Sequence, residues 1–213
     1  MSRLLSLVIA LLAPFIVGGW LITHGGLSAA AETKTASESV IPDMMVGNAD
    51  ANVIVIEYAS FTCPHCASFH AGPYKKLKKD YIDTGKIKFV FREVYFDKVG
   101  VWSSLIARCG GQERFFGIAD LIFKGQKEWA RAGSDVAVAN ELRKIGRLAG
   151  LDDDTLESCL TDSDKITALV GWFKENTSRD DISSTPTLLI NGEKYANMSY
   201  EDLVEIIDAQ LAK

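Results

Sequence analysis

The stretch Val53–Cys66 reads VIVIEYASFTCPHC, and it predicts how the fold begins. Its first half is β-branched and almost wholly apolar, as expected for a strand that is buried on both faces of a sheet. From Pro64 the spacing of apolar residues becomes helical, and this pattern continues through about Tyr81. Cys63 and Cys66 therefore lie where a buried strand turns into a helix.

The segments on either side complete a strand–helix–strand unit. Residues 48–52 supply a turn before the first strand, and Gly85 ends the helix. Ile87–Val94 then predicts a second buried strand. The helix between them carries large apolar side chains on the face opposite its lysines: Phe69, Tyr74, Leu77 and Tyr81. The cysteine pair is thus expected at the first strand-to-helix junction of a βαβ unit.

Residues 98–179 contain no strand-like stretch and predict a helical block. Helix-breaking and helix-capping residues divide this block at several places: Gly110–Gly111, Gly133–Asp135, Gly150 with Asp152, and Asp162–Asp164. We therefore expect several helices between the two halves of the fold.

The last part of the chain returns to strands. Asn191-Gly192 separates Thr187–Ile190 from Glu193–Tyr195, which is a strong signal for a two-residue hairpin. Ser199 then opens an amphipathic last helix. The order of elements is βαβ, helical insertion, ββα, which indicates an α/β fold.

The beginning of the chain has the layout of a secretory signal. Arg3 precedes a nearly continuous apolar run, Leu4–Ile22, and small residues at Ala29–Ala31 come before Glu32. The run is close to the roughly 20 residues that span a bilayer, so an uncleaved membrane anchor is the alternative. We favour cleavage before Glu32, with residues 1–31 as the signal and 32–42 as a linker. In either case the remainder is expected to be exported, as a periplasmic protein.

Composition limits the classes of partner. The chain has 213 residues, enough for one well-packed core or one domain with an insertion. Its 23 Lys and Arg stand against 28 Asp and Glu, a net charge of -5. This balance argues against a nucleic acid as the main partner.

A Cys-x-x-Cys motif serves redox centres and half of many zinc sites alike, so its context decides. The N-terminus of a helix favours the thiolate of Cys63, which makes Cys63 the expected nucleophile. Cys66 lies near enough to resolve a mixed disulfide at Cys63. Pro64 suits the first helical turn, and His65 would stabilise the thiolate further if it were protonated or donated a hydrogen bond. An exported chain disfavours the zinc alternative, in which Cys109 and Cys159 would complete the site.

At these residues the sequence resembles the DsbA family of exported thiol–disulfide oxidoreductases, and the resemblance covers nearly all of the chain after the signal. Cys-Pro-His-Cys and the helical insertion are both typical of that family. The resemblance implies a thioredoxin fold with an inserted all-helical domain. Residues 43–97 and 180–213 would form the thioredoxin-like domain, and 98–179 the insertion.

The resemblance also assigns roles to residues outside the motif. Thr185-Pro186 stands where the superfamily places a cis-proline that faces the cysteines and binds substrate, although a plain proline at a strand start is the alternative. Glu57 stands where the superfamily keeps an acidic residue beneath the site, which would shuttle protons for Cys66. A lone carboxyl group in an apolar strand is costly to bury without a task or a partner, which agrees. Glu57 would instead be exposed if its strand were an edge strand.

Three further residues are expected to have structural roles. Cys109 and Cys159 each follow helical spacing on an apolar face, so both are expected to point into the core of the insertion. In an oxidising compartment they are either inert free thiols or a disulfide, and we favour a structural disulfide. Some DsbA relatives carry such a second pair. His70, on the first helix, is interpreted as a surface or packing residue.

The function expected from these features is disulfide donation from Cys63 and Cys66 to reduced exported proteins. We expect a monomer without a cofactor or metal, and the resemblance implies that a membrane partner of the DsbB type reoxidises it. A disulfide isomerase is the nearest alternative, but such enzymes usually dimerise through an added N-terminal domain, for which residues 32–40 leave no room. A reductase, or a non-catalytic metal carrier or chaperone, is a further alternative.

Overall fold

The computed structural model describes residues 41–213. The expected signal segment and most of the expected linker lie outside these residues. Among residues 41–213, no helix is long and apolar enough to cross a membrane. The described elements, in chain order, are β1 (Met44–Gly47), β2 (Val53–Ala59), α1 (Pro64–Ala71), α2 (Pro73–Leu77), a π-helical turn η1 (Lys78–Ile82), β3 (Ile87–Glu93), α3 (Lys98–Cys109), α4 (Gly111–Trp129), α5 (Asp135–Leu148), α6 (Asp153–Thr161), α7 (Ser163–Arg179), β4 (Thr187–Ile190), β5 (Glu193–Ala196) and α8 (Tyr200–Leu211).

The five strands form one mixed sheet in the order β1-β3-β2-β4-β5. β2 is parallel to β3, as the predicted βαβ unit requires, and the other pairs are antiparallel. β4 and β5 form the predicted hairpin, in which Asn191 and Gly192 have φ of 48° and 86°. Positive φ at both central residues is what a type I′ turn needs, and Asn-Gly meets that need with little strain. The prediction of an α/β fold with a helical insertion is confirmed.

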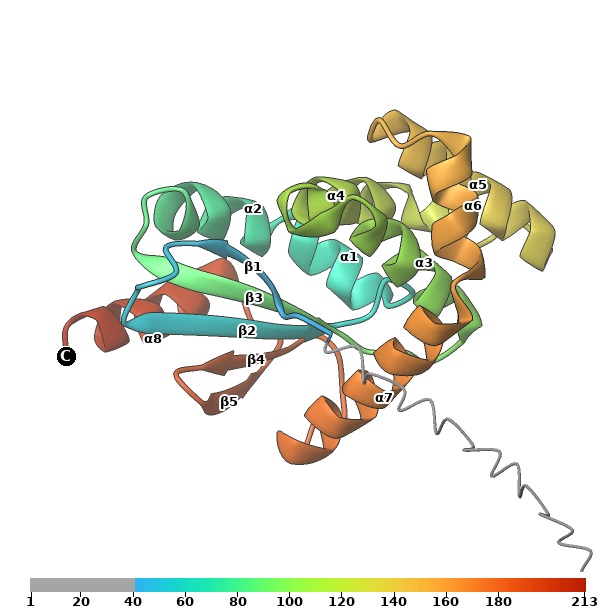
Figure 1. Cartoon of the computed structure of the whole chain (residues 1–213). Helices are drawn as coiled ribbons and strands as arrows, with labels where there is room; N and C mark the ends of the chain where they lie inside the picture. The colour runs from blue at the N-terminus through green and yellow to red at the C-terminus, as the bar shows by residue number, and fades with distance from the viewer. Residues whose placement is uncertain (1–40) are drawn as a thin grey trace, which may run out of the picture. The chain divides into compact units, whose positions relative to one another are not determined.

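The main core lies on one face of the sheet. Val53, Val55 and Ala59 of β2 point to this face and pack with apolar side chains of α1, α2, α4 and α8. Figure 1 shows α1, α2 and α4 gathered over this side of the strands. The side chains that alternate with these are less covered, since Ile54 and Ile56 are only partly buried. The expectation that β2 is buried on both faces is therefore wrong for its first half, because α7 covers the opposite face only near the strand's end.

The helical block runs from Lys98 to Arg179, the range expected for the insertion. Four helices of the block begin with a side chain that accepts a hydrogen bond from a backbone N–H group of the first turn. The capping residues are Asp97 for α3, Ser134 for α5, Asp152 for α6 and Asp162 for α7, and the last three lie at predicted helix breaks. Each such cap satisfies a donor that the first turn leaves free.

Three further details differ from the expectations. The helix predicted from Pro64 to about Tyr81 is interrupted at Gly72-Pro73, because proline lacks the N–H that would continue the hydrogen-bond ladder. Its predicted apolar face is nevertheless buried. The short edge strand β1 had not been predicted, since four residues are too few to establish an alternating pattern. The end of the expected linker is also packed: Ile41 is buried, and the Pro42 carbonyl accepts a hydrogen bond from Arg108 at 3.0 Å.

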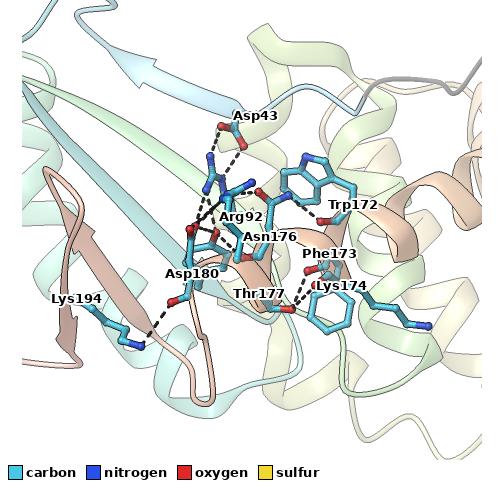
Figure 2. Close-up of polar contacts among 11 residues, drawn as sticks. Asp43, Arg92, Trp172, Phe173, Lys174, Asn176, Thr177, Asp180 and Lys194 are labelled. Carbon is cyan, nitrogen blue, oxygen red and sulfur yellow. Dashed lines mark hydrogen bonds and ion pairs between the residues drawn. The ribbon is translucent and has the colours of Figure 1, made fainter.

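A polar network joins the end of the insertion to the sheet (Figure 2). The guanidinium group of Arg92 on β3 donates to both carboxylate oxygens of Asp43, at 2.9 and 2.8 Å. Its Nη1 also donates to Oδ2 of Asp180, at 3.1 Å, and to the hydroxyl of Tyr58, at 2.9 Å. The segment before β1, the sheet and the residue after α7 are thereby held together by one half-buried cation.

Candidate active site

Cys63 and Cys66 lie at the N-terminus of α1. Cys63 is the N-cap residue, with extended backbone angles, and Pro64 occupies the first turn, where no N–H has to be donated. Both cysteines are free thiols in this structure. The Cys63 residue is 8% exposed, whereas Cys66 is completely buried. Cys63 therefore retains a small accessible area, whereas Cys66 has none.

The two thiols have opposite acidities. The pKa of Cys63 falls from 9.0 to about 5, chiefly because the Cys66 thiol donates a hydrogen bond to it. Hydrogen bonds from the Thr185 side chain and from the backbone N–H groups of Cys66 and His65 lower it further, against the opposing effect of burial. Burial raises the pKa of Cys66 far above its usual value, and the negative charge of Glu57 adds to this effect. At neutral pH the reduced pair therefore holds one thiolate, on Cys63.

The Thr185–Pro186 peptide bond is cis. Pro186 is buried just before β4, and the Thr185 carbonyl lies 3.5 Å from Sγ of Cys63, from which it accepts a hydrogen bond when Cys63 is a thiol. The loop that the resemblance assigns to substrate binding is thus placed directly beside the nucleophile.

Glu57 lies on the central strand β2 and is completely buried. Its Oε2 is 2.8 Å from Nε2 of His70 on α1. Among the described residues, its other oxygen, Oε1, has no hydrogen-bond partner. A buried acid with one oxygen held and the other unpartnered is suited to exchange a proton with a neighbouring group.

The interpretation of His70 as a surface or packing residue is only half right. Its ring does pack, because it stacks on Phe123 with centroids 4.2 Å apart and lies 4.5 Å from the ring of Tyr74. It is also the single described hydrogen-bond partner of the Glu57 side chain. Because Glu57 is completely buried, a surface residue could not make this contact. The sequence did carry a signal, since His70 follows Cys66 by four residues and so lies on the same face of α1.

Of the two ways in which the His65 imidazole was expected to stabilise Cys63, the hydrogen bond is not found in the structure. His65 and Pro64 are exposed, and no hydrogen bond joins the imidazole to any residue in the range 41–213. What His65 does give Cys63 is its backbone N–H. That contribution comes from the helix N-terminus and not from the identity of the side chain.

Gln126 was missed by the sequence reasoning. It lies on α4 and is buried, and its Nε2 donates to the carbonyls of Phe61 and Cys63 at 2.7 and 2.9 Å. The insertion therefore holds the backbone of the cysteine loop directly. Nothing in the local sequence around Gln126 indicates this contact, because it joins residues more than sixty positions apart.

Cys109 and Cys159 form a disulfide between α3 and α6, with Cα atoms 5.9 Å apart. Both residues are half-buried, so they lie at the edge of the insertion's core and not within it. Their sulfurs cannot serve as ligands for a zinc ion with Cys63 and Cys66 while they are bonded to each other. Among residues 41–213, no group of three or more His, Cys, Asp or Glu is arranged to hold a metal.

Beside this disulfide lies a buried ion pair. Arg108 and Glu93 form two hydrogen bonds, of 2.6 and 2.7 Å, and both side chains are almost completely buried. The bidentate geometry compensates the desolvation of both charges. It links the end of β3 to the residue before Cys109, and so fixes α3 on the sheet.

Comparisons with known proteins agree with this architecture. A family model described as Thioredoxin matches residues 39–209. A relative from Rickettsia bellii, provisionally named a protein-disulfide oxidoreductase, is 37% identical over 172 residues, which cover 78% of this chain and 63% of the relative. Disulfide bond formation protein D of Bacillus subtilis is 26% identical over 192 residues, covering 84% of this chain and 82% of that protein. The chain thus spans less than two thirds of the length of the Rickettsia relative.

Among solved structures, alpha-DsbA1 of Wolbachia pipientis superimposes with a TM-score of 0.75 and 26% sequence identity. The superposition covers 81% of this chain and 92% of that one. It includes both the sheet and the helical insertion of the present structure. The chain belongs to the thioredoxin family, and it has the DsbA-type fold within that family.

Proposed function

We propose that this protein is an exported thiol–disulfide oxidoreductase that donates the disulfide of Cys63 and Cys66 to reduced proteins. The observation that carries this proposal is the asymmetry of the pair. Cys63 lies at the helix N-terminus, is 8% exposed and has a pKa of about 5, whereas Cys66 is completely buried and has a raised pKa. The names of the relatives, which refer to disulfide oxidoreduction and disulfide bond formation, support the same class of reaction.

The reaction proceeds by two thiol–disulfide exchanges. A substrate thiolate attacks Sγ of Cys63 in the oxidised protein, the bond between Cys63 and Cys66 breaks, and Cys66 leaves as a thiolate. A second thiolate of the substrate then attacks the substrate sulfur of the mixed disulfide, and Cys63 leaves as a thiolate. Two electrons pass from the substrate to the protein, and the substrate gains a disulfide.

The surroundings of the two sulfurs favour this direction. A leaving group with a low pKa departs readily, which suits Cys63 in the second step. Only the reduced protein carries the stabilised thiolate, so the dithiol form is lowered in energy and the disulfide becomes the stronger oxidant. A reductase needs the opposite balance. The structure of the pair thus favours an oxidase over a reductase.

Proton transfer involves the buried side of the site. Cys66 leaves as an anion in a completely buried position, and its raised pKa means that it takes up a proton there. Glu57 is close enough for its charge to act on Cys66, and one of its oxygens has no described partner. We assign Glu57 as the group that relays a proton to Cys66, accepting it from solvent and passing it to the departing thiolate, with His70 holding the carboxyl group in place.

The surroundings in which the protein would act are part of the proposal. The apolar run at the start of the chain supports export to the periplasm, where reduced, newly exported proteins would be the substrates. They would lie extended along the loop before Pro186, beside Cys63. The chain would act as a monomer without a cofactor, and a DsbB-type membrane protein would reoxidise it.

Two measurements test the direction of the reaction. The first is the reduction potential of the Cys63–Cys66 couple against glutathione buffers, for which we expect a value more oxidising than about −180 mV. The second is the rate at which the oxidised protein forms disulfides in a reduced, unfolded substrate. A potential near the −270 mV or so of thioredoxin would identify a reductase. Faster rescue of a scrambled substrate than of a reduced one would identify an isomerase.

A further inference from the structure

A groove of about 450 Å³ lies beside the active site, between α1 and α4. It begins at Thr62 and Pro64, on either side of Cys63, and runs along the exposed side of α1. Ala67 and Phe123 form part of its apolar floor. A peptide that reacts with Cys63 thus has a continuous surface next to it, separate from the Thr185–Pro186 loop, which does not line this groove.

The rim of the groove is strongly basic. Lys124 and Lys127 lie three residues apart on α4, so they share one face of that helix, and Arg131 follows in the turn beyond it. Lys75 of α2 completes the rim. Asp120 is the one carboxylate that lines the groove, and its Oδ1 lies 3.8 Å from Nζ of Lys75. Four cations and one anion therefore surround this surface, although the whole chain carries a net charge of -5.

This local charge has no structural explanation within the described residues. Of the four cations, only Lys75 takes part in an ion pair there, and both members of that pair are largely exposed. Exposed pairs of this kind contribute little to stability. Exposed cations clustered at a reactive site, on a chain of opposite net charge, instead attract anionic ligands and accelerate their association.

We propose that the groove between α1 and α4 binds an acidic, extended segment of a polypeptide whose cysteine reacts with Cys63. This inference rests on the proposed function, since it concerns the choice of substrate at the same site. Acidic side chains would lie along Lys124, Lys127 and Arg131, and an apolar side chain would rest on Phe123 and Ala67. The apolar floor favours a peptide over a nucleic acid, which would need a longer basic surface to follow its backbone.

The test compares two reduced peptides of one design, each with two cysteines, flanked either by Asp and Glu or by Lys. The second-order rate of disulfide transfer from the oxidised protein is measured for both, and the ratio of acidic to basic rates is taken. The test variant is Lys124→Glu/Lys127→Glu. We expect its ratio to be about tenfold lower than that of the wild-type protein. The reason is that two exposed side chains that attract the acidic peptide in the wild-type protein repel it in the variant. Added salt should bring the two ratios together.

A matched control carries the same change of net charge elsewhere. Lys79 and Lys174 are both exposed and lie outside the groove, so Lys79→Glu/Lys174→Glu should leave the ratio within about twofold of wild type. Using one peptide pair throughout cancels the difference in their own thiol reactivity. An unchanged ratio in the Lys124/Lys127 variant, or an equal fall in the control, overturns the proposal.

A binding measurement separates this inference from the proposed reaction. Fluorescence anisotropy follows the same labelled acidic peptide with both cysteines replaced by serine, so that no exchange takes place. Saturable binding that the Lys124→Glu/Lys127→Glu variant loses supports the groove, even if disulfide transfer fails for both peptides. Absence of binding, or concentration-dependent dimerisation of the protein that the same variant abolishes, counts against an acidic peptide as the occupant.

Discussion

The molecule carries two pairs of cysteines in two regions that treat sulfur differently. Cys63 and Cys66 lie three positions apart at the start of α1, are free thiols, and differ widely in pKa. Cys109 and Cys159 are separated by 50 positions and form a disulfide between α3 and α6 of the insertion. The same side chain serves a reactive site in the first region and a covalent link in the second.

The difference comes from what surrounds each sulfur. At Cys63, donors from the Cys66 thiol, the Thr185 side chain and two backbone N–H groups converge on one position. These donors stabilise an anion, and an anion is both a nucleophile and a good leaving group. Cys109 lies at the opposite end of its helix, as the last residue of α3, where the dipole disfavours a thiolate. The position of each cysteine in its helix thus favours thiolate formation at Cys63 and disfavours it at Cys109.

The largest expected effect follows from removing the nucleophile. Cys63→Ser should abolish disulfide transfer to reduced substrates, because Cys63 is the one described cysteine that is both a free thiol and stabilised as a thiolate. Under the same assay, Cys109→Ser/Cys159→Ser should keep most of the wild-type rate. Measurable transfer by Cys63→Ser would mean that the insertion's disulfide is itself exchanged, and the contrast between the two pairs would fail.

The second prediction concerns stability. Cys109→Ser/Cys159→Ser should lower the free energy of unfolding by about 4 kcal/mol, since the bond closes a loop with a sequence separation of 50. Denaturant unfolding monitored by circular dichroism measures this directly. The expected result is a lower midpoint. If the variant is as stable as the wild-type protein, then the buried pair of Arg108 and Glu93 suffices to hold α3 on the sheet.

The third prediction concerns the proton that Cys66 takes up. Glu57→Gln keeps the shape of the side chain but removes the acid, so the first exchange should slow by about a hundredfold near neutral pH. His70→Phe keeps the stacking on Phe123 and removes the partner of Glu57, and a smaller decrease is expected. Rapid mixing of the oxidised protein with a monothiol peptide measures this step. Equal rates in wild type and Glu57→Gln would remove Glu57 from the mechanism.

The fourth prediction follows from the depressed pKa of Cys63. Since this pKa falls from 9.0 to about 5, the thiolate stabilises the folded, reduced protein fully above pH 9.0, and this stabilisation is lost as the pH falls through about 5. The oxidised protein lacks this group. The stability of the reduced form relative to the oxidised form should therefore increase between those two values, as measured by thermal unfolding across pH. A difference that does not change with pH would contradict the low pKa.

The fifth prediction tests how the insertion supports the reactive pair. Gln126→Leu leaves the buried carbonyls of Phe61 and Cys63 without their described donor, which should cost about 1–3 kcal/mol of stability. The position of Cys63 should loosen as well, so its pKa should rise. Glu128→Ala on the same helix is the control, because Glu128 is exposed. Unchanged stability in Gln126→Leu would show that the loop holds its shape without α4.

Much of this could be predicted from the sequence, because the decisive signals are local. The strand before Cys63, the Asn191-Gly192 hairpin and the helix-capping residues each act through neighbours within a few positions. The cysteine motif is equally local. Its position at a helix N-terminus follows from the change of apolar spacing at Pro64, and the structure places it there.

What the sequence did not indicate depends on contacts between distant segments. Gln126 reaches the loop of Cys63 from another element, and the pairing of His70 with Glu57 depends on where β2 lies, although the spacing had indicated that His70 shares a helix face with Cys66. The half-open face of β2 is a third example, since the cover over Ile54 and Ile56 depends on where α7 packs. Apolar periodicity reports that a side is buried but not which element buries it.

The smallest expected effect concerns His65 and sharpens the account of the reactive pair. Replacing His65 by alanine keeps the backbone N–H that stabilises the Cys63 thiolate and removes an imidazole that is exposed. An exposed side chain without a described hydrogen bond to the sulfur contributes little, so the pKa of Cys63 should move by less than about one unit and the potential by less than about 30 mV. Ultraviolet absorbance of the thiolate followed against pH gives the pKa.

Cys66→Ala is the matched comparison for that experiment. It removes the hydrogen bond that lowers the Cys63 pKa most, so it should raise this pKa clearly more than His65→Ala does. The two variants rank the sources of the thiolate's stability, a neighbouring thiol against an exposed imidazole. If His65→Ala produced the larger shift, the imidazole would be the main source. The identity of the residues between the cysteines, and not the geometry of the helix N-terminus, would then set the oxidising strength of the pair.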